Sequence, residues 1–352
     1  MRVGIIAANN VRYSPYIFFY TSILDSLDVM YELIVPDRNE LKEMSSDVSI
    51  NMFSWNRNLP TILNYIKYTN DVKRLLEKKK YDFIIALTSI NAAFLGLWLK
   101  KHYNRKYIVD IRDYTHEDIY PFYLLEKVAV NNSLLNIISS RKFTEFLPQS
   151  RYLVCHNFSD NTPISEHFEK HFDPIRIGYV GGISYVEQCA KLMHLISKDI
   201  RFRLDFYGTS DQEIILKEQS KEYQCERIVF HGGYAPMEKE EILHRVDILF
   251  NAYGNGIPLL DYALSNKLYD SLAYKKPILT CSGTYMTEMA GPLAFPIDLQ
   301  DDNALNDLYS WYQKTDSLII DEYANRMIES IRRENDQTKE IITESILSVL
   351  EI

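Results

Sequence analysis

Short apolar runs alternate with longer amphipathic segments along most of this chain, and this alternation restricts its fold more than any other feature. In the first half, the runs are rich in Ile and Val and bounded by polar residues, as expected of strands at 3–8, 31–36, 82–88 and 106–111. Apolar residues at three- and four-residue spacing predict helices over 14–28, 60–80, 91–103 and 121–147. The repeated β–α order predicts a parallel sheet covered by helices.

The same order begins again in the second half of the chain. Strand-like runs that end in small or polar residues cover 176–182, 202–208, 227–233, 247–254 and 276–282. A chain of 352 residues exceeds the size at which one hydrophobic core usually stops growing. We therefore expect an α/β protein with two tandem Rossmann-like, doubly wound domains.

The domain boundaries follow from composition. A polar, proline-containing stretch near 160–174 is typical of a linker, so we expect a first domain over 1–165, a linker over 166–174 and a second domain over 175–325. Residues 326–352 continue a charged helical pattern that starts near Asp321. This last helix is expected to pack outside the second sheet or to cross back to the first domain.

The charge distribution argues against binding to nucleic acid. The net charge is −9, and it divides into 21 Lys/Arg against 19 Asp/Glu over 1–170 and 18 against 29 over 171–352. A nucleic-acid protein would need a strong basic footprint. Four widely spaced cysteines without CxxC pairs favour a cytoplasmic location, and the longest apolar stretch, 84–99, is too short and too polar to span a bilayer.

Two features of the second half suggest an anion site at the carboxyl ends of its strands. Gly181 and Gly182 follow the first strand, where glycine lets backbone amides approach a phosphate, although a turn alone could also require it. In the stretch 261–279, Ser265 or Asn266 is expected to cap a helix. Lys267 then lies in the first turn, where a cation is unfavourable unless an anion binds.

Asp270 follows Lys267 on the same helical face and could accept hydrogen bonds from sugar or ribose hydroxyls. The alternative interpretation is an ordinary Lys267/Asp270 pair on the helix surface.

Five motifs follow one another over 179–279, in the order YVGG, FYG, FHGG, DILFNAYG and SNKLYDSLAYKKPIL. Together they resemble the donor domain of GT-B glycosyltransferases of family 4, especially those of capsule and O-antigen synthesis. The resemblance implies a nucleoside-diphosphate-sugar donor such as a UDP-sugar and transfer with retention. Because no Asp-x-Asp motif stands at an expected strand end, we expect no metal and no other cofactor. The donor-binding residues that we expect, from the chain's own pattern and from this resemblance, are Gly181, Gly182, Gly208, Gly233, Tyr234, Asn266, Lys267 and Asp270.

The sequence departs from the family pattern at two places. Asp270 occupies the position of the second acid of the family's Glu-x7-Glu motif, but the first acid falls on Tyr262, with Asp261 one place away. The usual basic pair near the diphosphate is incomplete, because the segment after Gly182 has no basic residue before Lys191. Lys267 is therefore the best candidate for the phosphate cation.

On the acceptor side, charged residues are dense at 109–118, after a strand of the first domain. The resemblance favours Asp113 as the catalytic residue and His116 as the second candidate, either as a general base or as a group that orients a substrate. For Asp110 an ion pair with Arg112 is the preferred interpretation. Asn10, Arg12 and Arg112 are the expected acceptor-side residues.

The predicted function is transfer of a sugar to a hydroxyl of a glycan or a lipid-linked acceptor in cell-surface polysaccharide synthesis. Two alternatives stay open, namely a nucleotide-sugar epimerase of the same architecture and a non-catalytic sugar-nucleotide-binding subunit. Aromatic and basic residues mixed over 55–80 and 98–107 suggest peripheral contact with an anionic membrane, and an ordinary solvated face explains them equally well.

Overall fold

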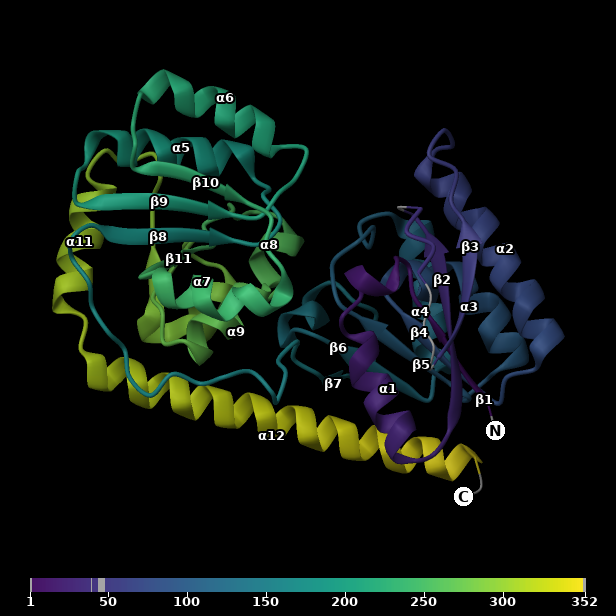
Figure 1. Ribbon diagram of the computed structural model, residues 1–352. Helices are drawn as coiled ribbons and strands as arrows, with labels where there is room; N and C mark the ends of the chain where they lie inside the picture. The colour runs from purple at the N-terminus through teal and green to yellow at the C-terminus, as the bar shows by residue number, and fades with distance from the viewer. Residues whose placement is uncertain (1, 39, 44–47, 351–352) are drawn as a thin grey trace. The chain divides into compact units, whose positions relative to one another are not determined.

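The computed structural model describes residues 2–38, 40–43 and 48–350. The chain divides into two compact units, residues 1–157 with 333–352 and residues 158–332. Each unit contains one sheet whose paired strands are all parallel, with helices packed against it (Figure 1). The expected α/β class with two Rossmann-like units is confirmed.

The first unit is built on a seven-stranded sheet with the order β3-β2-β1-β4-β5-β6-β7. Its strands are β1 (Arg2–Ile6), β2 (Met30–Asp37), β3 (Ser49–Ser54), β4 (Phe83–Leu87), β5 (Tyr107–Ile111), β6 (Leu135–Ile138) and β7 (Leu153–Val154). Its helices are α1 (Ile17–Ser26), α2 (Thr61–Lys79), α3 (Ser89–His102) and α4 (Tyr120–Asn132), with 3-10 turns η1 (Val11–Tyr13) and η2 (Arg141–Glu145). The four strands expected from the sequence are all present.

The helix expected over 121–147 is wrong in its second half. Helix α4 ends at Asn132, because Ser133 is extended, and the chain then enters β6, which pairs with β5. The short run Leu135–Ile138 fits a helical spacing as well as a strand, and only its pairing in the sheet selects the strand. Strands β3 and β7 were also missed.

The second unit contains a six-stranded sheet with the order β10-β9-β8-β11-β12-β13. Its strands are β8 (Ile175–Val180), β9 (Phe202–Tyr207), β10 (Ile228–Gly232), β11 (Ile248–Phe250), β12 (Ile278–Thr280) and β13 (Ala294–Pro296). Its helices are α5 (Val186–Lys198), α6 (Glu213–Tyr223), α7 (Lys239–Arg245), α8 (Pro258–Tyr262), α9 (Asn266–Ala273), α10 (Tyr285–Ala290) and α11 (Ala304–Lys314), with 3-10 turns η3 (Pro236–Glu238) and η4 (Gly291–Leu293). Five of these strands match those expected, and the short β13 was missed.

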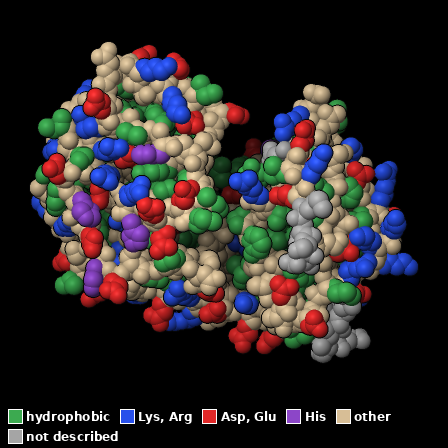
Figure 2. Space-filling model, viewed as in Figure 1, with side chains coloured by type: hydrophobic (Ala, Val, Ile, Leu, Met, Phe, Trp, Pro, Cys, Tyr) green, Lys and Arg blue, Asp and Glu red, His purple; other side chains and the backbone are tan. Residues whose placement is uncertain are grey.

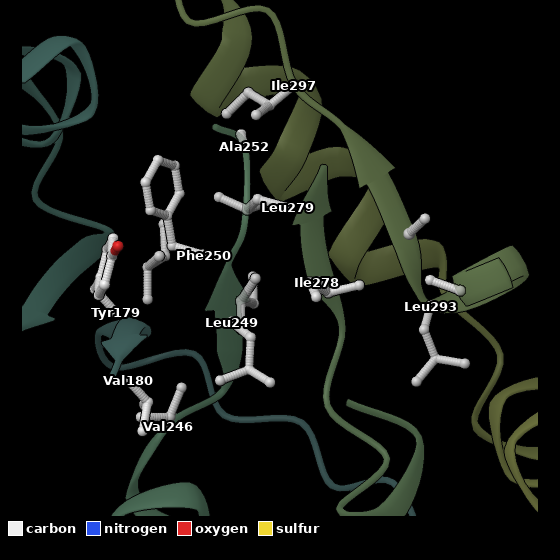
Figure 3. Packing of buried hydrophobic residues seen from close by; sticks show 14 of the residues in the cluster. Tyr179, Val180, Val246, Leu249, Phe250, Ala252, Ile278, Leu279, Leu293 and Ile297 are labelled. Atoms are coloured by element: carbon white, nitrogen blue, oxygen red, sulfur yellow. The ribbon is translucent and has the colours of Figure 1, made fainter. Parts of the chain in front are cut away.

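Apolar side chains of both sheets form the cores. In the second unit, Leu249 and Phe250 of β11 pack beside Ile278 and Leu279 of β12, and Tyr179 of β8 lies next to Phe250 (Figure 3). A separate cluster of buried residues fills the first unit. Burial on this scale supplies most of the driving force for folding.

Helix α12 (Ser317–Leu350) is shared by the two units. Ile320, Ala324 and Ile328 pack into the core of the second unit, whereas Ile342 and Ile346 pack into that of the first. The expected return of the last helix to the first domain is thereby confirmed. None of the helices in the described part of the chain has the length and apolar character needed to cross a bilayer.

The expected linker lies within the second unit and is held to it by side chains. The backbone N–H of Phe168 donates to Asp321 Oδ1 over 2.8 Å, and His171 Nδ1 lies 2.8 Å from Asp247 Oδ1. His167 Nδ1 lies 3.0 Å from Asp321 Oδ2.

Candidate functional site

The carboxyl ends of β8, β9 and β10 meet through backbone hydrogen bonds. The N–H of Gly181 donates to the carbonyl of Tyr207, and that of Gly208 donates to the carbonyl of Gly232. Gly208 has a φ of +138°, and a Cβ atom there would overlap the carbonyl oxygen of Gly181, itself at φ +126°. The backbone conformation therefore requires glycine at two of the expected donor-site positions, Gly181 and Gly208, and these two residues lie side by side.

The other expected glycines lie in open positions. A Cβ atom at Gly182 would meet nothing within 4 Å, and one at Gly233 would make only ordinary contacts with Thr209. Tyr234 packs against the core of the second unit, and burial, together with the charge of Asp270, raises its pKa. Space in front of Gly182 is compatible with a ligand at this edge.

Lys267 is the most unusual group of the second unit. Its side chain is buried at the first turn of α9, and its Nζ atom lies 4.6 Å from the ring centroid of Tyr179 and 5.3 Å from that of Tyr253. A Cβ atom on Gly181 would lie 3.6 Å from this Nζ, so the lysine reaches the strand-end glycines. Its ammonium makes no hydrogen bond or close ion pair with any described residue.

Burial lowers the pKa of Lys267 to about 8, because the charged form loses its water. Asp270 opposes this shift and Lys239 adds to it. A buried ammonium that contacts only aromatic faces is costly unless an anion joins it. The geometry therefore provides a cation in need of an anionic ligand.

Asp270 is also buried, but its partner is not Lys267. Its Oδ1 atom pairs with Nζ of Lys239, at the start of α7, over 2.7 Å. Burial raises the pKa of Asp270, and the two lysines hold that rise back. The alternative of a Lys267/Asp270 surface pair is wrong, since both side chains are buried and Asp270 binds a residue 31 positions away.

The start of α9 differs from the expected cap. Ser265 occupies the N-cap position, but its hydroxyl donates to Asn251 Oδ1 over 2.7 Å and caps no backbone amide. Asn266 is the exposed first residue of the helix. Asp261 accepts the backbone N–H of Gly256 over 2.8 Å and so stabilises the loop before α8.

Sequence reasoning missed Lys239 and the aromatic side chains around Lys267. Lys239 stands in the charged segment 238–241, which resembles any solvated helix start. Tyr253 stacks on Tyr185 with ring centroids 4.2 Å apart, and Tyr185 adopts a left-handed backbone conformation before α5. No spacing rule signals such contacts.

In the first unit, the preferred interpretation of Asp110 is confirmed. Its carboxylate and the Arg112 guanidinium form a buried ion pair of 2.7 Å, and Tyr20 donates a hydrogen bond to Asp110 over 2.6 Å. Arg112 also donates to the carbonyl of Cys155. These contacts tie the end of β5 to α1 and to the segment after β7.

The loop between β5 and α4 carries the expected catalytic residues. Asp113 and His116 are exposed there, and the His116 ring makes an edge-to-face contact with Phe122 of α4, at 5.7 Å between centroids. The buried carboxylate of Glu117 accepts the N–H of Thr115 over 2.5 Å. This contact orders the loop from within. Asp113 and His116 keep exposed surface, but partial desolvation raises the pKa of Asp113 to about 6, with Glu117 adding to the shift and Arg112 opposing it.

The expected acceptor-side residues after β1 differ in exposure. Asn10 is fully buried, donates to Asp37 Oδ1 over 3.1 Å and accepts the N–H of Arg38 over 3.0 Å. Arg12 is exposed, and its backbone N–H donates to Glu43 Oε1 over 2.9 Å. Asn10 thus joins two strand ends, whereas the Arg12 side chain is free to meet solvent or a ligand.

Another buried acid, Glu126, interacts electrostatically with Glu117 of the Asp113 loop. Glu126 of α4 is fully buried, and burial, then repulsion by Glu117, raise its pKa to about 8, with Ser89 opposing the shift. Sequence reasoning placed this residue on an ordinary helix and missed it.

Several solved structures share this architecture over nearly the whole chain. The sucrose-phosphate synthase of Thermosynechococcus elongatus matches with a TM-score of 0.75 and 11% identity, covering 99% of this chain and 100% of that one. HepE of Anabaena, in complex with UDP and glucose, matches with a TM-score of 0.70 and 12% identity, covering 98% and 100%. The chain has the GT-B fold.

Another GT-B match is the lipopolysaccharide outer core galactosyltransferase WaaB, with a TM-score of 0.67 and 14% identity, covering 97% of this chain and 99% of that one. A protein named as a UDP-N-acetylglucosamine 2-epimerase from Listeria monocytogenes also matches, with a TM-score of 0.60 and 8% identity over 92% and 90%. No protein-family model matches the sequence, and no curated protein matches it significantly. The GT-B fold alone therefore does not separate transfer from epimerisation.

Proposed function

We propose that this chain is a glycosyltransferase that uses a nucleoside-diphosphate sugar as donor and transfers its sugar to a hydroxyl group. The observation that carries the proposal is the buried Lys267 ammonium beside Gly181, at the carboxyl edge of the second sheet. Such edges are the usual ligand sites of open α/β sheets. A diphosphate supplies the negative charge that this cation lacks.

The donor would be held by groups of the second unit. Lys267 and the backbone around Gly181, Gly182 and Gly208 bind the diphosphate, while Gly233 and Tyr234 contact the base. Asp270, oriented by Lys239, accepts hydrogen bonds from sugar or ribose hydroxyls. The exposed Asn266, at the first residue of α9, contributes a polar contact.

UDP is the first nucleotide to test, because the related fold of HepE is known with UDP and glucose. In this chain Asp261 is engaged with the Gly256 amide, and the motif's first acid position holds Tyr262. Asp270 is therefore the acid that we assign to hydroxyl recognition. Retention of the anomeric configuration belongs to the proposal through the family resemblance. Independence from metal ions belongs to it because the sequence has no Asp-x-Asp motif at a strand end.

On the acceptor side, we assign the proton-accepting or orienting role to Asp113 and a supporting role to His116. Both side chains are exposed on one loop, so both can reach a substrate. Arg12 offers an exposed cation for an anionic acceptor, whereas Asn10 and Arg112 shape this side from within through their buried hydrogen bonds.

The acceptor in this proposal is a glycan or a lipid-linked glycan of the cell surface. WaaB, which shares the fold, is named for a step in the lipopolysaccharide outer core. A lipid-linked acceptor lies in a membrane, so we further propose a cytoplasmic enzyme that binds the inner membrane face peripherally.

Release of nucleoside diphosphate from a panel of UDP-, GDP- and dTDP-sugars tests the function. The full chain should release nucleoside diphosphate slowly without an acceptor and faster with one, and Lys267→Met should lose both rates. Lys217→Met, on the exposed face of α6, is the matched control.

The same assay separates the alternatives. An epimerase would produce the epimeric sugar, and a non-catalytic subunit would bind the nucleotide sugar without releasing nucleoside diphosphate. Either result would overturn the transferase proposal.

A further inference from the structure

Helix α2 of the first unit presents an exposed apolar ridge. Its members are Leu59, just before the helix, and Ile62, Leu63 and Ile66 within its first two turns, with 40%, 52%, 47% and 43% of their surfaces exposed. Their spacing of three and four residues places them on one face of the helix. Four large aliphatic side chains in one exposed stripe are more than scattered surface residues explain.

Two of the aromatic residues in the segment 55–80, Tyr65 and Tyr68, are turned inward. Tyr65 and Tyr68 are buried, Tyr68 donates hydrogen bonds to the carbonyls of Ala7 and Ile34, and Tyr65 packs edge-to-face on Trp55. The inward face of α2 therefore fixes the helix to the sheet. The apolar ridge on its outward face is left to solvent.

The same outward face becomes basic toward the end of α2. Lys67 lies one helical turn from Leu63, and the exposed Arg74 and Lys78 follow at three- and four-residue spacing through the partly exposed Asp71. Residues 55–106 hold 11 Lys/Arg against three Asp/Glu, although the whole chain has a net charge of −9. Figure 2 shows Lys and Arg side chains gathered over the part of the first unit that carries α2.

We propose that the outward face of α2 docks on an anionic lipid bilayer, with the ridge Leu59, Ile62, Leu63 and Ile66 inserted among the headgroups and the basic half of the helix on the phosphates. Apolar area and cationic flanks together are what interfacial helices require. Each cation near an anionic leaflet strengthens binding roughly fivefold, and salt weakens it.

This inference rests on the lipid-linked acceptor of the proposed function, because such a substrate would require the enzyme to reach a membrane. An anionic bilayer is favoured over a second copy of this chain by charge. A second copy would bring the Lys67 and Lys78 charges of one basic half toward the same charges of another, which is repulsive.

Sedimentation with phosphatidylcholine vesicles, with and without phosphatidylglycerol, tests the inference on the full chain at low salt. Wild type should sediment with the anionic vesicles only, and added salt should release it. Ile62→Gln with Ile66→Gln should weaken this partitioning about tenfold or more, and Lys67→Gln with Arg74→Gln should weaken it on anionic vesicles. The matched control is Ile214→Gln with Ile215→Gln, on the exposed face of α6, which should sediment like wild type.

Three results would overturn the inference: wild type that stays in the supernatant, an Ile62/Ile66 variant that sediments like wild type, or a wild-type dimer that this variant dissociates in light scattering. The last would show that a second copy covers the ridge. Nucleoside-diphosphate release measured without vesicles should be equal in all variants. This release assay tests the proposed transferase function separately from membrane binding. A failure of the membrane inference can therefore be told apart from a failure of the proposed function.

Discussion

Nζ of Lys239 lies 2.7 Å from Oδ1 of Asp270, and this ion pair joins the start of α7 to the middle of α9 in the second unit. Both helices begin near the carboxyl edge of the sheet, where the donor is proposed to bind. The pair keeps a buried carboxylate oriented, and Lys267, one turn away on α9, is left available for a different anion.

Replacing Lys239 should separate the structural from the binding role of this pair. Lys239→Met leaves Asp270 buried without its partner, so the free energy of unfolding should fall by about 1–2 kcal/mol. The loss is smaller than for a fully buried ion pair because Lys239 is partly exposed and water screens its charge. The double variant with Asp270→Asn should recover most of that loss in urea denaturation but should not recover donor affinity. A single variant as stable as wild type would contradict the structural role.

Removing the Lys267 charge should weaken donor binding without loss of fold. Lys267→Met keeps the apolar stem that packs on Tyr179 and deletes one charge-assisted interaction with the diphosphate. We expect UDP to bind about 10–100-fold more weakly by titration calorimetry. The melting temperature should not fall, because a desolvated charge has been removed. Lys217→Met is the control, and equal UDP affinity in all three proteins would refute the assignment.

Donor affinity should fall as the pH rises through about 8. The pKa of Lys267 is lowered to about 8 in the free protein by burial, and a bound diphosphate favours the charged form. Binding above this pH therefore requires uptake of a proton, and affinity drops by up to about tenfold per pH unit. Calorimetric titrations at several pH values should show this slope in wild type, and Lys267→Met should flatten it.

Glu126 should make the fold less stable at alkaline pH. Burial raises its pKa to about 8, whereas an unfolded glutamate loses its proton near pH ~4.3. Between these values only the folded state holds the proton, so stability falls as the pH rises, by at most about 1.4 kcal/mol per pH unit.

Glu126→Gln removes this proton linkage. In urea denaturation the variant should be more stable than wild type at pH 8, and the difference should shrink at pH 5. Glu218→Gln, at an exposed position of α6, should show no such trend. The same difference at both pH values would argue against a protonated Glu126.

Substitution of Asp113 should affect turnover rather than donor binding. Its side chain is exposed on the β5–α4 loop of the first unit, whereas the proposed donor contacts lie in the second. Asp113→Ala should lower kcat by about 10²–10⁴-fold with the UDP affinity unchanged. Asp118→Ala, in the same loop and also exposed, is the matched control. Loss of UDP affinity in Asp113→Ala would instead indicate a structural role.

The sequence by itself determined the alternation of strands and helices, except at β3, β6, β7 and β13, because apolar periodicity is a local property of the chain. It therefore predicted the two α/β units, the strand-end glycines Gly181 and Gly208, and the position of Lys267 at the start of α9. It also predicted the Asp110–Arg112 pair, whose members are two residues apart.

Only the tertiary structure decided the environment of these groups. Lys239 meets Asp270 across 31 positions, Tyr179 and Tyr253 enclose Lys267, and Leu135–Ile138 becomes a strand by pairing with β5. Each outcome depends on which distant segments the topology brings together and on how much water they exclude. Burial and electrostatic pairing are properties of the packed chain, whereas periodicity belongs to each segment alone.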